Sequence, residues 1–126
     1  MSVRMALAKL SACAAGGVTT SFAMPNVQPP PNTAERLAAM IELYGSRAVV
    51  DWNINAAGTV PDEIPAMATM GIAAFKVFMV TDTGRDYPHM PGIGVHDHGK
   101  LLEIFETVGP TGLVVHALDR AARRSR

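Results

Sequence analysis

The sequence has little cysteine, no net charge and no long apolar run, and each shortage excludes a class of protein. Cys13 is the single cysteine among 126 residues, so an internal disulfide framework and a cysteine-rich zinc site are excluded. Eleven basic and eleven acidic residues cancel, which leaves no electrostatic case for a nucleic-acid or membrane partner. No apolar run approaches the roughly 20 residues that a membrane-spanning helix requires.

What is present favours one folded domain. Hydrophobic residues make up 48% of the chain and charged residues 17%, which is typical of a globular protein. The segment 10–13 (LSAC) is similar to a lipoprotein cleavage box, but Lys9 interrupts the apolar run that export would need. We therefore expect a helix over residues 1–15, ended by Gly16 and Gly17, and a cytoplasmic location.

Strand and helix patterns alternate along the rest of the chain. The apolar and β-branched runs predict strands over residues 18–23, 47–54, 73–80 and 113–117. Helical spacing predicts helices over residues 34–44, 61–70 and 99–108, the last with Leu101, Leu102, Phe105 and Val108 inward. Regular alternation predicts an α/β fold with parallel strands. Four strands are too few to close an eight-stranded barrel, so the chain is either a small open sheet or part of a barrel.

Lys76 is the unusual residue of the third predicted strand, whose sequence is AAFKVFMV. Both faces of this strand are otherwise apolar, as expected of a parallel strand buried on two sides. A buried lysine must reach solvent, find a partner or lose its charge, because burial shifts the pKa of an ammonium downward. A lysine held neutral in this way is chemically useful.

His116 lies at the carboxyl end of the next predicted strand, where sites form in α/β folds. Because one crossover helix joins the two strands, we expect Lys76 and His116 to be neighbours. A neutral histidine binds zinc readily, and a neutral lysine can react with carbon dioxide to give an anionic carbamate. The spacing alone favours a lysine that reaches the strand end and a histidine satisfied within the fold, and both interpretations stay open.

Three further polar residues are candidates for a functional site. His96 and His98 flank Asp97, but the segment immediately precedes a helix, so we predict Asp97 as its N-cap with two solvated histidines. Asn26 follows the first predicted strand at the edge where ligands bind, although a turn-forming asparagine needs no function.

Three stretches together resemble the cyclic amidohydrolases, the dihydroorotase, hydantoinase and allantoinase group of the amidohydrolase superfamily. They are AAGGVTTSFAMPNVQPP, GIAAFKVFMV and GLVVHALD, in this order between about Ala14 and Asp119. The resemblance implies a (β/α)₈ barrel with a binuclear metal centre, usually zinc. It implies that Lys76 is carbamylated and bridges the metals, that His116 is a metal ligand, and that Asn26 helps to hold the substrate.

The resemblance also implies that much of the family's site is missing. The H-x-H pair of the family's first strand would precede Met1, and the later histidine and the catalytic aspartate would follow Arg126. We therefore expect residues 1–119 to be a fragment of a metal-dependent barrel, followed by an arginine-rich tail over residues 120–126. The parent reaction would be the hydrolysis of a small cyclic amide or ureide.

Two expectations follow for the isolated chain. It should be inactive alone, because Lys76 and His116 supply too few ligands for two zinc ions. Its open sheet edges should favour homo-oligomers or aggregation. The alternative interpretation is a non-catalytic α/β domain that self-associates or binds a partner.

Overall fold

The computed structural model describes residues 3–79 and 93–118, which form one parallel sheet with helices on one side. The predicted tail over residues 120–126 and the end of the strand predicted over residues 73–80 lie outside the described residues. The strands are β1 (Thr20–Ala23), β2 (Asp51–Ala57), β3 (Ala74–Met79), β4 (Gly94–Val95) and β5 (Val114–Leu118). The helices are α1 (Val3–Ala15), α2 (Ala34–Arg47), α3 (Ile64–Ala68) and α4 (His98–Val108), with 3₁₀ turns η1 (Pro61–Glu63) and η2 (Gly109–Thr111).

The strand order confirms the predicted α/β class. The sheet runs β1, β2, β3 and then β5, every pair is parallel, and the two-residue β4 pairs with the carboxyl end of β3. One helical crossover separates each of the long strands from the next, as a parallel sheet requires. The sheet does not close on itself within the described residues, which fits a part of a barrel.

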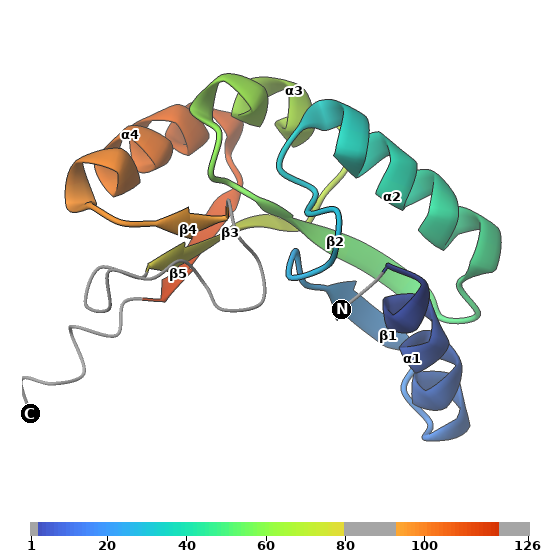
Figure 1. Ribbon diagram of the computed structural model, residues 1–126. Coiled ribbons are helices and arrows are strands. Elements are labelled where there is room, and N and C mark those ends of the chain that lie inside the picture. Colours follow the sequence, from blue (N-terminus) through green and yellow to red (C-terminus); the bar gives the residue numbers. More distant parts are fainter. Residues whose placement is uncertain (1–2, 80–92, 119–126) are drawn as a thin grey trace, which may run out of the picture.

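The helices α2, α3 and α4 form a single layer over one face of the sheet, so that the molecule has the shape of an arch (Figure 1). The core lies between this layer and the strands. It is built from fully buried side chains of both layers, among them Leu37, Ile54, Ile64, Phe75, Val77 and Ile104. We call this side of the sheet the helical face.

The opposite side of the sheet carries no helix among the described residues (Figure 1). Side chains alternate along each strand, so every residue beside a core residue points to this side. We call it the open face; its members are Phe22, Asn55, Ala57, Lys76, Phe78, Val114 and His116. Ile93 packs on Ala57 and Phe78, and it covers part of the open face.

Two predicted boundaries were wrong for one reason. Gly45 was expected to end the second helix, but α2 continues to Arg47, because Ala48 N–H donates to the Tyr44 carbonyl and Ser46 Oγ to the Leu43 carbonyl. The next strand consequently begins at Asp51 rather than residue 47 and extends to Ala57, where pairing with β3 holds it extended.

The inward stripe predicted for α4 was half wrong. Leu102 is 57% exposed and Phe105 42% exposed, whereas Ile104 and Val108 are buried. The helix is turned so that positions 101, 104 and 108 face the sheet, a spacing of three and four residues that the sequence also offers.

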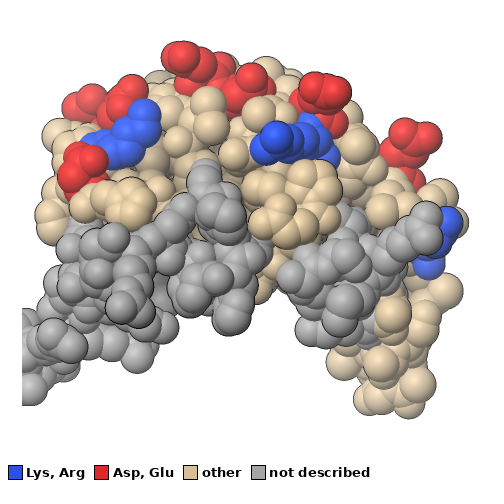
Figure 2. Space-filling model, in the orientation of Figure 1, with Lys and Arg blue, Asp and Glu red and all other residues tan. Residues whose placement is uncertain are grey.

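The outer surface of the arch is charged. In Figure 2, acidic and basic side chains gather over the helical layer. None of the described helices is long and apolar enough to cross a membrane.

Candidate functional site

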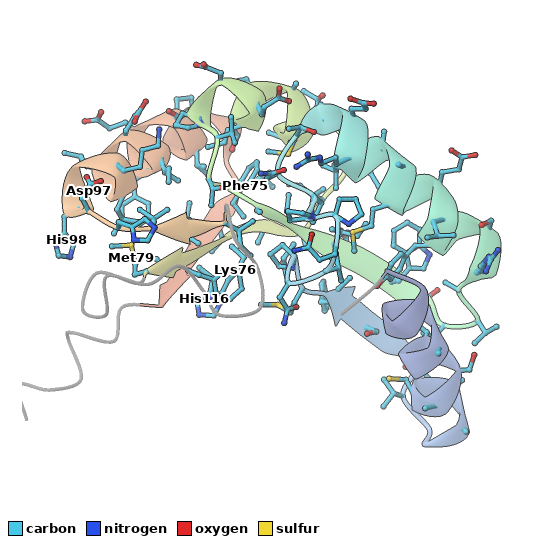
Figure 3. All side chains as sticks on the ribbon, viewed as in Figure 1. Phe75, Lys76, Met79, Asp97, His98 and His116 are labelled. Carbon is cyan, nitrogen blue, oxygen red and sulfur yellow. The ribbon has the colours of Figure 1, made fainter. Side chains whose placement is uncertain are left out.

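Lys76 and His116 are direct neighbours in the sheet, as the sequence predicted. They are register partners in the pairing of β3 with β5. Both project from the open face, whereas Phe75 points toward the helices (Figure 3). The core fixes this orientation. Phe75 and Val77 flank Lys76 in β3 and pack into the core on the helical face, so Lys76 must point to the other side.

The Lys76 side chain is 3% exposed, and its Nζ has no hydrogen-bond partner in the part of the chain that the structure describes. Its neighbour is the Phe78 ring, whose centroid lies 4.9 Å from Nζ. Burial removes water from the ammonium and lowers the pKa of Lys76 below the ordinary lysine value. The amine is therefore neutral more readily than a surface lysine, and a neutral amine is a nucleophile.

His116 is exposed on the open face and is accessible to a ligand. Its imidazole beside the buried amine fits part of a metal centre: the ring nitrogen suits zinc, and a carboxylated lysine would supply an anionic oxygen ligand. Within residues 3–79 and 93–118, no group of three or more His, Cys, Asp or Glu side chains is placed to hold a metal ion. The donors among the described residues thus supply some of the ligands of a metal site and not a complete set.

The remaining predicted residues belong to other segments of the chain. Asp97 is the N-cap of α4, as expected: its carboxylate accepts a hydrogen bond of 2.7 Å from the Lys100 N–H. His96 is exposed, and His98 opens α4 at some distance from His116 (Figure 3). Asn26 follows β1 and is half-buried.

Two polar side chains that the sequence patterns did not single out also belong to this region. Asn55 lies on the open face, and its amide donates to the Met24 thioether, at 3.5 Å. Thr59 follows β2, and its Oγ1 is buried without a partner among the described residues. The alternation along β2 (Asp51–Ala57) is a sequence signal for Asn55, whereas Thr59 lies beyond the end of that strand.

Known proteins support a specific relationship. A dihydroorotase from Aeropyrum pernix is 41% identical over 71 residues, and one from Methanothermobacter thermautotrophicus is 28% identical over 109 residues. The matches cover 54% and 86% of this chain. The chain is related to the cyclic amidohydrolases. No protein-family model matches it.

The fold agrees with this relationship. An L-hydantoinase (dihydropyrimidinase) from Arthrobacter aurescens superposes with a TM-score of 0.68 at 28% identity, over 86% of this chain. The open sheet therefore corresponds to part of a hydantoinase barrel. The chain spans 16% and 23% of the two dihydroorotases and 23% of the hydantoinase.

Proposed function

We propose that this chain contributes to a zinc-dependent site that hydrolyses a small cyclic amide or ureide. The observation that carries the proposal is the pairing of Lys76 with His116. A buried amine without a partner lies directly beside an exposed imidazole, on the sheet face that lacks a helical layer among the described residues. The dihydroorotase and hydantoinase relatives support the reaction class.

Each proposed residue has a role suited to its chemistry. Lys76, once carboxylated, would offer two oxygen atoms to metal ions, and His116 would offer a ring nitrogen. Zinc, when bound, would lower the pKa of a bound water and polarise the amide carbonyl. Asn26, at the carboxyl edge of β1, would hydrogen-bond the substrate through an amide that can donate and accept.

The isolated chain is expected to be inactive. A catalytic zinc ordinarily takes three protein ligands and keeps a fourth position open, and the described residues supply two proposed donors, Lys76 and His116, for two ions. We also propose a cytoplasmic location, which the single cysteine supports.

Zinc content and turnover of the purified chain test the proposal together. The chain is incubated with zinc and bicarbonate, freed of excess metal, and assayed on dihydroorotate, hydantoin and allantoin. We expect bound zinc that is lost in Lys76→Arg and in His116→Ala and kept in the matched control His96→Ala, with no turnover. Zinc retained equally by all four proteins would contradict the proposed ligands, and turnover would contradict the expected inactivity.

A non-catalytic, self-associating α/β domain is the second candidate. The open face favours it, because Phe22 and Val114 are 59% and 66% exposed and apolar side chains at a sheet surface invite a partner. Light scattering distinguishes the two functions. A defined oligomer that forms without zinc and is lost in Phe22→Ser and Val114→Ser would favour the second candidate.

A further inference from the structure

Two buried side-chain polar atoms have no hydrogen-bond partner among the described residues, Lys76 Nζ and Thr59 Oγ1. Folded proteins rarely leave such atoms unpaired, because each lost hydrogen bond destabilises the fold. A buried polar atom without a hydrogen-bond partner therefore needs an explanation, and a chemical group that binds beside it is one explanation. The proposed function accounts for Lys76 and leaves Thr59 unexplained.

The backbone places Thr59 on the open face. Ala57 belongs to that face, and a Cβ added to Gly58 would lie 3.2 Å from the Phe75 Cβ, on the helical face. Val60 is extended, with φ −121° and ψ 95°. Alternation therefore returns Thr59 to the open face, the side from which Lys76 projects.

Thr59 also lies two residues beyond Ala57, the register partner of Lys76. The Gly58 N–H donates to the Lys76 carbonyl at 3.1 Å. Continuing this register places Thr59 beside Phe78. Lys76 Nζ lies 4.9 Å from the Phe78 ring centroid, so the amine extends along β3 toward the level of Thr59.

The two atoms do not bond each other, since neither has a hydrogen-bond partner among the described residues. A group attached to Nζ would extend the lysine further along the open face. Diagonal neighbours on adjacent strands are about 7–8 Å apart, a span that long side chains can bridge. The added group would lie near Ala57, Phe78 and Ile93, whose side chains are apolar and cannot donate a hydrogen bond. A donor placed among them would therefore stabilise the added group.

We propose that Thr59 is a positioning residue whose hydroxyl donates a hydrogen bond to the carboxylate formed when carbon dioxide adds to Lys76. The Nζ lone pair forms a bond to the carbon of CO₂, and one C=O electron pair moves to oxygen. A proton then leaves Nζ for water, which gives an N-carboxylate anion and a hydronium ion. The inference rests on the proposed function, because it requires Lys76 to be carboxylated.

Carbon-13 NMR of the full chain in ¹³C-bicarbonate, with and without zinc, measures this carboxylation directly. The bicarbonate concentration for half-carboxylation is compared in the natural chain and in Thr59→Val, which removes the hydroxyl at constant shape. A hydrogen bond to a charged group is worth roughly a tenfold change or more, so we expect Thr59→Val to need at least roughly tenfold more bicarbonate. Thr59→Ser should restore most of the difference. Thr107→Val is the matched control, because the Thr107 hydroxyl donates to the Glu103 carbonyl on α4.

Failure of this inference and failure of the proposed function give different results. A carbamate signal with the same bicarbonate dependence in Thr59→Val and in the natural chain would overturn the role of Thr59 and leave the proposed function standing. If the natural chain shows the same spectrum as Lys76→Arg, even with zinc and excess bicarbonate, then Lys76 is not carboxylated. That result would overturn both the role of Thr59 and the proposed function.

Urea unfolding distinguishes a loss of the carbamate signal from a loss of the fold. Without bicarbonate, the Thr59 hydroxyl is an unpaired buried group, so Thr59→Val should be as stable as the natural chain or more stable. With bicarbonate, the natural chain should gain more stability than the variant, by linkage to the bound group. A variant that is equally destabilised in both buffers would indicate a purely structural role and contradict the inference.

Discussion

The two faces of the sheet differ sharply although the same strands build both. On the helical face, Phe75 and Val77 are fully buried between the strands and three helices. On the open face, Lys76 is buried without a partner and Phe22 and Val114 are largely exposed. The helical face is thus filled by core packing. On the open face, several side chains have no partner among the described residues. The packed core thus lies on the helical face, and the proposed site lies on the open face.

Matched phenylalanine substitutions test this division most strongly. Phe75→Ala should cost about 3–5 kcal/mol of unfolding free energy, because it leaves a cavity under the helices. Phe22→Ala should cost under about 0.5 kcal/mol, because that ring is mostly in solvent. Urea denaturation of both variants measures the difference, and equal losses would show that the two faces are not energetically distinct.

Lys76→Met should stabilise the chain, by on the order of 1–3 kcal/mol at pH 7 in bicarbonate-free buffer. The substitution removes a buried amine that has no hydrogen-bond partner among the described residues, and it keeps the length of the side chain. A destabilised Lys76→Met variant would mean that the amine is satisfied in the fold.

The stability of the natural chain should also depend on pH through Lys76. The pKa of Lys76 is lowered by desolvation in the folded state, so below the ordinary lysine pKa the unfolded chain binds a proton that the folded chain resists. Stability should therefore rise with pH between the lowered pKa of folded Lys76 and the ordinary lysine pKa, and the slope should be smaller in Lys76→Met. Urea midpoints across this range measure it, and identical slopes would contradict the burial of the amine.

Asp97→Ala should have a smaller effect, a loss of about 1 kcal/mol, because it removes the N-cap of α4. Asp62→Ala is the matched control, since Asp62 lies in the first turn of η1, where no side chain caps the N-terminus. Thermal unfolding followed by circular dichroism compares the two. An equal loss in both would contradict a specific capping role for Asp97.

The sequence was sufficient for the fold class, the Lys76–His116 pairing and the Asp97 cap, because each depends on local patterns. Period-two alternation orients Lys76, and a short crossover brings His116 beside it. The sequence was insufficient at the end of α2, where capping by Ala48 and Ser46 overrides Gly45, and at the rotation of α4. Thr59 was missed because its buried hydroxyl follows from the three-dimensional cover around β2 and not from any motif.

Zinc affinity, measured by competition with a chelator at low and high bicarbonate, tests the central claim most directly. If Lys76 and His116 hold the same ion, bicarbonate should tighten zinc binding in the natural chain and should have no effect in Lys76→Arg. His116→Ala should weaken binding at every bicarbonate concentration while its unfolding free energy changes by less than about 0.5 kcal/mol. Zinc binding that is indifferent to bicarbonate and unchanged in both variants would contradict the account.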